Sequence, residues 1–393
     1  MDYYYKCSEC GKTYPITSDR MLCEDCSSKQ VSGRPLRGIL EVEMEGKLAD
    51  CTSIYSVLPI EKKWFPDIPV GNTPLWAPKR LQQKHGFPNL LIKDDTRNLT
   101  GSFKDRASWL IAAFALKWGI RHVTVASTGN AASSMAGIGA AAGLKVTIYV
   151  PGSIPKAKLV QSLQYGAGVI SVNGSYDDAF RMAMKPHSSE KVLNRNTGYN
   201  PLTIEGKKTA SFELCHQMTN TPDYIFVPTG DAVVLSGMIK GFKDLQKLGK
   251  IGKFPKFIAV QAEGSSALAR AMEQGDFSEP VKSETIADSI QVDVPACGYY
   301  ALHELKAHDG DCIRVSDNEI RQAQIELSSE AGLFAEPSAA ASLAGLLRMK
   351  ADIEPEAKIV LLASGTGLKD VDNAQQAVEK AGRTITRKEV TDD

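Results

Sequence analysis

Short apolar runs alternate along the chain with longer segments in which apolar residues recur every three or four positions. The runs HVTVAS (122–127) and KVTIYVP (145–151) are rich in β-branched residues, which is typical of buried strands. The segments 107–118 and 130–142 are each followed by a glycine, a common end signal for a helix. Strands and helices that alternate at this spacing predict right-handed βαβ units and parallel sheets.

The same pattern extends over most of the chain and predicts an α/β fold. Strands are expected at 89–95, 122–127, 145–151, 169–174, 223–230, 256–262 and 358–367. We expect residues 36–393 to form two interleaved, doubly wound domains with mostly parallel sheets. The small domain is predicted at about residues 100–210, and the large domain takes the remainder.

The N-terminal segment has a different signature, a pair of C-x-x-C motifs. Its cysteines follow the spacing C-x2-C-x12-C-x2-C and are Cys7, Cys10, Cys23 and Cys26. This spacing favours a structural zinc ion, because four thiolates close a tetrahedral site and leave no open position. A disulfide-linked pair or four ordinary thiols is the alternative. We therefore expect a zinc-ribbon-like module at residues 1–35, followed by a linker with an acidic patch at 41–50.

Composition and charge exclude several classes of protein. The 393 residues carry 46 basic and 46 acidic side chains, so no charge excess points to nucleic acid or to a membrane surface. The most apolar window, 131–150, contains Lys145 and several glycines and is not a membrane span. The first ten residues lack the features of a signal peptide, and we expect a cytoplasmic protein.

Candidate chemistry lies where the predicted strands end. Ligands gather at the carboxyl ends of strands in α/β sheets, and helix starts bind anions through free N–H groups. The notable tips are SFKDR (102–106), ASTGN (126–130), YNP with EGKKT (199–209), PTGDAVV (228–234) and ASGTG (363–367). None of them is a P-loop or a dinucleotide fingerprint, and GIGAAAG (137–143) is expected to serve helix packing.

A lysine is the reactive group that this pattern favours. The chain has no H-E-x-x-H or G-x-S-x-G motif, its histidines are dispersed, and Asp94-Asp95 fits a solvated strand end. Lys104 follows a turn and comes just before a predicted helix. A lysine amine reacts when it is neutral or already held as an imine. Both conditions fit pyridoxal phosphate, whose aldehyde takes a lysine and whose phosphate needs an amide cradle.

The motifs together resemble the fold-type II pyridoxal-phosphate enzymes and, within them, the threonine synthase family. SFKDR after Asn98 and Thr100-Gly101, then STGN, EGKKT and SGTGLKD, carry the resemblance over roughly residues 60–370. The cysteine segment also resembles an N-terminal extension of some threonine synthases.

The resemblance implies a role for each matching position. Lys104 would bind the cofactor covalently, Asn130 would hydrogen-bond its ring hydroxyl, and Ser364 would face its pyridine nitrogen. The loop that wraps the cofactor phosphate would be Gly230, Asp231, Ala232, Val233 and Val234. The substrate would be held by Ser127 and Thr128 at its carboxylate and by Lys156 and Asn200 at its own phosphate.

The resemblance implies a lyase that converts O-phosphohomoserine and water into threonine and phosphate, and it implies a homodimer. The family often has an arginine after Asn-Pro, where this chain has Thr203. A cysteate synthase acting on phosphoserine, or a serine or threonine dehydratase, is therefore an alternative. A zinc-knuckle interaction protein with an inert enzyme-like domain is the alternative from another class.

Overall fold

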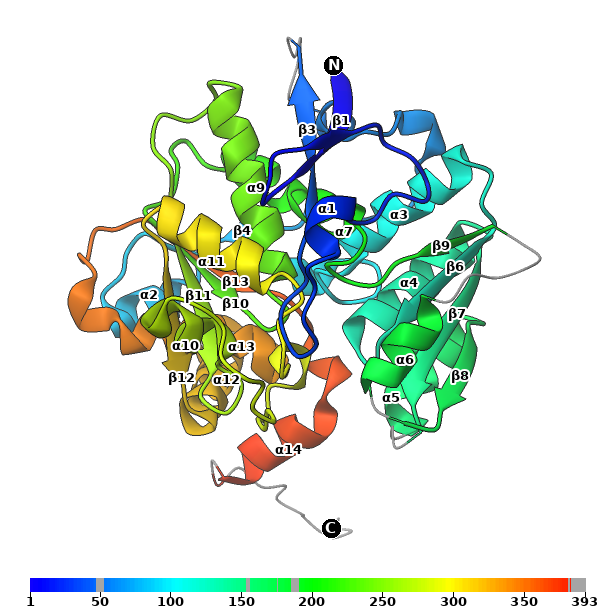
Figure 1. Cartoon of the computed structure of the whole chain (residues 1–393). Helices are drawn as coiled ribbons and strands as arrows, with labels where there is room; N and C mark the ends of the chain where they lie inside the picture. Colours follow the sequence, from blue (N-terminus) through cyan, green and yellow to red (C-terminus); the bar gives the residue numbers. More distant parts are fainter. Residues whose placement is uncertain (47–52, 153–155, 175, 185–190, 381, 383–393) are drawn as a thin grey trace, which may run out of the picture.

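The computed structural model describes residues 1–46, 53–152, 156–174, 176–184, 191–380 and 382. Their strands form three sheets, and helices flank the two larger sheets (Figure 1). Both larger sheets are built mainly from parallel pairs. The α/β fold with parallel sheets that the alternating pattern predicts is therefore confirmed.

The largest sheet has six strands in the order β12-β11-β10-β13-β5-β4. All neighbours are parallel except β4 and β5. Its strands are β4 (Leu75–Trp76), β5 (Leu90–Asp94), β10 (Tyr224–Pro228), β11 (Lys256–Ala262), β12 (Asp311–Val315) and β13 (Ile359–Ala363). The central strands are almost wholly buried, as expected for a sheet covered on both faces.

The second sheet has four parallel strands in the order β8-β7-β6-β9. Its strands are β6 (His122–Ala126), β7 (Lys145–Pro151), β8 (Gly168–Val172) and β9 (Val192–Asn194). This sheet falls within the range expected for the small domain. The domain boundaries themselves stay a prediction.

The helices connect these strands and fill the space around them. They are α1 (Glu24–Ser27), α2 (Lys79–His85), α3 (Asp105–Lys117), α4 (Asn130–Ala141), α5 (Lys156–Gln164), α6 (Tyr176–Ala183), α7 (Leu202–Lys207), α8 (Thr209–Gln217), α9 (Val233–Lys247), α10 (Ala267–Gln274), α11 (Gly298–Ala307), α12 (Asp317–Ala331), α13 (Pro337–Arg348) and α14 (Val371–Lys380). The GIGAAAG segment lies in and just after α4, where a side chain at Gly137 would come within 2.6 Å of Thr100. Its predicted role in close packing is confirmed.

The N-terminal residues form a third, antiparallel sheet in the order β2-β1-β3. Its strands are β1 (Asp2–Cys7), β2 (Thr13–Tyr14) and β3 (Leu40–Glu45). The expectation of a linker at 41–50 is wrong for residues 41–45, which pair with β1, and residues 47–50 lie outside the described residues. The acidic side chains alternate with buried apolar ones, which is the pattern of a strand.

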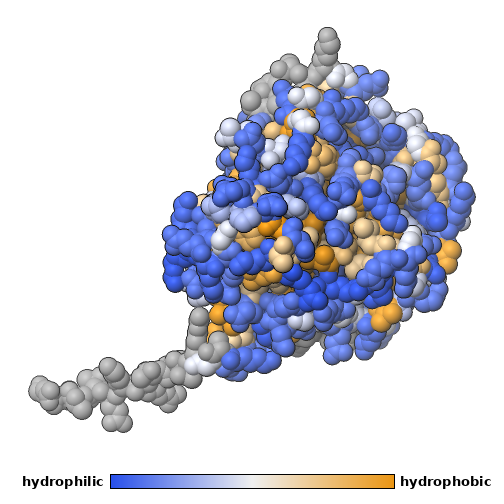
Figure 2. Space-filling view, turned by 90° about the vertical axis from the view of Figure 1, so that its left-hand side faces the viewer, coloured by the Kyte–Doolittle hydropathy of each residue, from blue (hydrophilic) through white to orange (hydrophobic). Residues whose placement is uncertain are grey.

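The molecular surface is mostly hydrophilic on the face that Figure 2 shows, with apolar side chains gathered near its centre. Among the helices that the structure describes, none combines the length and the apolar character needed to cross a membrane.

The order of the strands brings the candidate tips together. Strands β10, β13 and β5 are parallel neighbours, so the residues that follow them emerge at one edge of the sheet. An isolated bridge joins Ser102 to Gly365, and the Phe103 amide donates a hydrogen bond of 2.8 Å to the Ser364 carbonyl. The loops after β5 and β13 are thereby fixed to each other.

Candidate active site

Lys104 is the N-cap residue of α3, directly after the loop that follows β5. The acid beside it fixes that loop, because the Thr100 amide and hydroxyl donate to the buried Asp105 carboxylate at 2.7 and 2.6 Å. On the other side of the loop, the Thr366 amide donates to the Gly101 carbonyl at 3.0 Å. The lysine therefore stands on a rigid corner rather than on a free loop.

Arg106, the base that follows Lys104, is fully buried in an ion network. Its guanidinium donates to Asp95 at 2.6 Å and to Glu213 of α8 at 2.5 Å. Asp94 and Asp95 are buried, so the expectation of a solvated strand end at this pair is wrong. Lys93 of β5 donates to the same glutamate at 2.6 Å. Burial alone would raise the pKa of Glu213, but the two cations lower it to about 2. The network ties β5, α3 and α8 together just behind Lys104.

One small cavity collects most of the predicted cofactor residues. It is lined by Lys104, Asn130, Pro228, Thr229, Gly230, Asp231, Ala232, Val234, Leu235, Ser289, Ile290, Glu336 and Ser364. Val233 is the one predicted cofactor residue that does not line it, since its side chain is buried in the core. The roles of these residues stay predictions, although residues from six separate segments meet at one point.

The loop before α9 is shaped to bind an anion. Ala232 has a φ of +64°, a left-handed conformation that is uncommon for a residue other than glycine. Among the described residues, the amides of Gly230, Ala232 and Val234 have no hydrogen-bond acceptor. Such a turn directs successive N–H groups into one concavity at the positive end of a helix. The residues present therefore fit the phosphate of pyridoxal phosphate.

Glu336 is a site residue that sequence reasoning missed. It is 4% exposed, and the Asn130 side-chain amide donates to its carboxylate at 3.0 Å and to the Ser289 hydroxyl at 3.0 Å. Burial raises the pKa of Glu336, against the effect of Asn130 and Lys104. The available signal was a polar residue before Pro337, which marks a helix start but not a site.

A larger cleft of about 1210 Å³ adjoins the small cavity and shares Asn130, Ser289 and Glu336 with it. Thr128 and Gly129 line it from the loop before α4. Its positively charged lining residues are Arg97 and Lys369. The Lys369 amine donates to Ser133 at 3.0 Å and to Gln161 at 2.6 Å, and burial lowers its pKa.

Three predicted substrate residues have other surroundings. The Ser127 hydroxyl accepts from the Gly129 amide at 3.3 Å and does not line the cleft. Asn200 is 1% exposed, and its side chain donates to the Asn194 carbonyl at 2.7 Å within its own turn. The structure does not bring Asn200 into the cleft, and its contacts favour a structural role. The side chain of Lys156, at the start of α5, lies outside the described residues.

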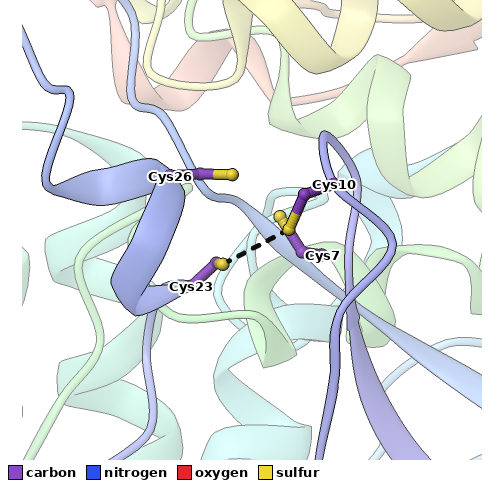
Figure 3. A group of neighbouring side chains, drawn as sticks. All are labelled: Cys7, Cys10, Cys23 and Cys26. Carbon is purple, nitrogen blue, oxygen red and sulfur yellow. Dashed lines mark hydrogen bonds between the residues drawn. The ribbon is translucent and has the colours of Figure 1, made fainter.

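The four N-terminal cysteines form a separate cluster (Figure 3). Their sulfur atoms all lie within 4.8 Å of one another, and those of Cys10 and Cys23 are 3.7 Å apart. Four sulfurs around a tetrahedral zinc ion would be separated by about 3.8 Å, given a Zn–S bond of about 2.3 Å. Burial raises the pKa of Cys23, but a hydrogen bond with the Tyr14 hydroxyl helps to lower it to about 7. The donor set fits a zinc ion.

Comparison with known proteins decides the family. The sequence profile of the family described as "Pyridoxal-phosphate dependent enzyme" matches residues 67–365. The chain belongs to this family. The match covers the loop of Lys104, the amide cradle and Ser364, so the cofactor suggested by the motifs is supported by the whole catalytic region.

Within the pyridoxal-phosphate dependent enzymes, the chain is similar to threonine synthases. It is 34% identical to the threonine synthase of Methanosarcina acetivorans over 94% of this chain and 92% of that protein. It is 37% identical to that of a Bacillus species over 81% of this chain and 89% of that protein. These relatives confirm the resemblance that the motifs carry, and with it a lyase that depends on pyridoxal phosphate.

The fold is shared with more distant enzymes. A fungal L-serine ammonia-lyase from Rhizomucor miehei has a TM-score of 0.67 at 21% identity, covering 79% of this chain and 98% of that chain. At this identity the similarity shows the fold alone.

Proposed function

We propose that this chain is a threonine synthase, which converts O-phosphohomoserine and water into threonine and phosphate. The observation that carries the proposal is the pair of joined cavities. The small one combines Lys104 with an amide cradle, and the large one opens beside Asn130 and contains Lys369. Similarity to threonine synthases over 94% of the chain supports the same reading.

In this proposal, the residues of the small cavity hold pyridoxal phosphate, which also extends into the adjoining large cleft because the small cavity has only about 10 Å³ of open space. Lys104 binds it, the amides around Ala232 bind its phosphate, Asn130 faces its ring hydroxyl and Ser364 its ring nitrogen. The bound cofactor would supply an electron sink for negative charge at the substrate carbon atoms. The neutral hydroxyl of Ser364 does not force the ring nitrogen to stay protonated, which suits elimination better than transamination.

The substrate would occupy the large cleft. The start of α4, with Thr128, would bind its carboxylate through free amides and the helix dipole. Lys104, which lines the small cavity, would move protons at the α- and β-carbons. Burial of Glu336 beside Asn130 would keep the ring-hydroxyl contact fixed during these transfers.

The second phosphate needs its own cation, and Lys369 is the strongest candidate. It lines the large cleft and already donates to two neutral groups that a phosphate oxygen can replace. Lys156 remains proposed for the same role from its position at the start of α5. Asn200 is the weakest of the predicted phosphate ligands because its side chain bonds within its own turn.

A replacement or elimination enzyme is the second candidate, and one observation favours it. Thr203, at the position where the family often has arginine, is fully buried, and its hydroxyl donates to the Asn200 carbonyl at 2.7 Å. No guanidinium therefore reaches the substrate from this position.

A turnover panel separates these functions. Purified protein would be given phosphohomoserine, phosphoserine with sulfite, serine or threonine, and phosphate and amino-acid products would be measured. Fastest turnover of phosphohomoserine is expected. Faster turnover of an unphosphorylated amino acid would replace the synthase with a dehydratase. A colourless protein without a visible cofactor band would contradict both and leave an inert domain.

The cysteine cluster is proposed to hold one structural zinc ion. All four ligands are protein sulfurs, so the ion would have no open position for substrate. Metal analysis of freshly reduced protein should give one zinc per chain.

A cytoplasmic homodimer is the proposed assembly. The family resemblance and the apolar patch near the centre of the face in Figure 2 support a dimer. Light scattering after size-exclusion chromatography tests the stoichiometry.

A further inference from the structure

Lys207, the last residue of α7, is a buried amine that the proposed mechanism does not use. Its side chain is 0% exposed, and its Nζ atom has no hydrogen-bond partner in the part of the chain that the structure describes. Three other fully or almost fully buried lysines all have partners: Lys93 pairs with Glu213, and Lys208 and Lys240 pair with Asp244. Burying an amine without a hydrogen-bond acceptor costs free energy. We therefore asked which bound group could accept a hydrogen bond from Lys207.

The position of Lys207 connects it to the cofactor cavity. Its Cβ atom lies where a side chain on Gly237 of α9 would meet it at 2.5 Å, so α7 and α9 are in close contact at this point. Helix α7 also packs against α3. Burial lowers the pKa of Lys207 well below its usual value; the nearby Asp231 carboxylate opposes this effect and the Lys104 amine adds to it. Lys207 therefore lies beside the two helices, α3 and α9, whose starts carry Lys104 and the amide cradle.

The anion cradle contains a negatively charged side chain, that of Asp231. The Asp231 carboxylate accepts a hydrogen bond of 3.0 Å from the Val233 amide, at the positive end of α9. Burial opposes its ionisation, yet Lys104 and Lys207 lower its pKa, so the side chain is an anion. A phosphate dianion in the same cradle would be repelled by this carboxylate unless a cation lies nearby. Lys104 would be joined to the cofactor through its amine, and of the other two cations that lower the pKa of Asp231, Lys207 has a larger effect than Arg195.

We propose that the Lys207 ammonium is a binding group for the phosphate of the cofactor and offsets the carboxylate of Asp231 in the same cradle. This assignment rests on the proposed use of pyridoxal phosphate. The buried amine gains its missing acceptor when the phosphate binds, because the negative charge of the phosphate favours the protonated form of the amine. The cradle thereby becomes specific for the phosphorylated cofactor. Lys207 therefore acts through affinity for the phosphate and not through proton transfer to the substrate.

The test compares two ligands that differ only in the phosphate. Cofactor-free full-length protein and its Lys207→Met variant would be titrated with pyridoxal phosphate and with pyridoxal. The variant should bind pyridoxal phosphate roughly 10- to 100-fold more weakly, the factor for one charge-assisted hydrogen bond, and pyridoxal as tightly as the native chain does. Its cofactor-free form should unfold at the same or a higher temperature, because an unpaired buried amine has been replaced by an apolar side chain.

Two further variants keep the result unambiguous. Lys240→Met removes a buried lysine from α9 that is paired with Asp244, and it should change the affinities for both ligands equally. Adding Asp231→Asn to Lys207→Met should recover part of the lost affinity, since the repulsive carboxylate is gone. Equal affinity of Lys207→Met and native protein for pyridoxal phosphate would overturn the assignment. An equal loss for pyridoxal, without recovery by Asp231→Asn, would also overturn it. A native chain that binds no pyridoxal phosphate would instead reject the proposed function.

Discussion

Local sequence patterns predict some of the residues around Lys104 but not the residues that contact them. The sequence predicts Lys104, the cradle loop and Ser364 as site residues because each follows a recognisable strand, and the structure brings them to one cavity, while their roles stay predictions. Their supporting partners were not predicted, because those contacts are made across the fold. Glu213 reaches Arg106 from 107 positions away, and Glu336 reaches Asn130 from 206 positions away. No local pattern encodes such pairs.

At this scale, the first prediction concerns the identity of the cofactor lysine. Lys104→Ala should fold and should lose covalent labelling by borohydride, since no amine remains at the start of α3 to form an imine. Mass spectrometry of the reduced, digested protein measures the label. Lys117→Ala, which removes a surface lysine at the end of the same helix, is the control and should be labelled like the native chain. If the Lys104→Ala variant were labelled at another lysine, that lysine and not Lys104 would be the one that binds the cofactor.

Glu336 gives a second prediction at the same scale. Glu336→Gln should lower turnover by roughly 10-fold while the cofactor stays bound, because Asn130 now meets two acceptor oxygens and would keep one, a hydrogen bond worth about 0.5–1.5 kcal/mol. The visible absorption band of the cofactor should shift in the same direction in Glu336→Gln and in Asn130→Ala. A general loss of stability would not produce such a shift. Glu330→Gln, at a surface pair with Arg80, is the matched control. A normal spectrum together with normal turnover would remove Glu336 from the site.

At the scale of whole elements, the sequence was most informative for buried parallel strands. The bounds of β7 and β11 agree with the predicted runs at 145–151 and 256–262. A continuous apolar run is typical of a strand that is buried on both faces of a parallel sheet. Strand β3 lies where the sequence predicts a linker with an acidic patch. Those glutamates pair with α9 instead: Lys243 donates to Glu41 at 3.2 Å, and Lys247 donates to Glu43 at 2.7 Å.

The ion network that joins β5, α3 and α8 makes acid stability predictable. Glu213 has a pKa of about 2 in the folded chain, against about 4.3 when unfolded. Its contribution is therefore present above pH 4.3 and is lost as the pH falls toward 2, with an upper limit of about 3 kcal/mol. The free energy of unfolding of the native protein should therefore fall relative to that of Glu213→Gln, by up to about 3 kcal/mol, as the pH is lowered from about 4.3 to 2. Chemical unfolding at several pH values measures it.

A surface variant calibrates the acid experiment. Glu279→Gln changes a glutamate that is 84% exposed and paired with Arg34, so its stability should follow the native curve at every pH. If native protein and Glu213→Gln differed by the same free energy at pH 2 and pH 6, the network would not hold the carboxylate ionised.

At the scale of the whole molecule, the N-terminal sheet is not an isolated appendage. The Cys23 amide donates to the Gly38 carbonyl at 2.8 Å, which ties the cysteine cluster to the segment before β3. In the same segment, the Leu36 amide donates to the Ala296 carbonyl at 3.1 Å. The next residue, Cys297, donates its amide to the Asp231 carbonyl at 3.0 Å. A short series of backbone contacts thus joins the proposed zinc site to the anion cradle.

Removal of the metal should therefore lower the affinity of the chain for its cofactor. Four thiolates without their ion repel one another or become protonated, and the segment around Gly38 loses its anchor. Chelation is expected to lower the unfolding temperature and to weaken the binding of pyridoxal phosphate, because the Asp231 carbonyl loses support through Cys297. Calorimetry and cofactor titration measure the two effects, and zinc added back should reverse both. Cys312→Ser, a variant outside the cluster, should leave metal content unchanged. If zinc were lost with unchanged cofactor affinity, the module would serve only its own stability.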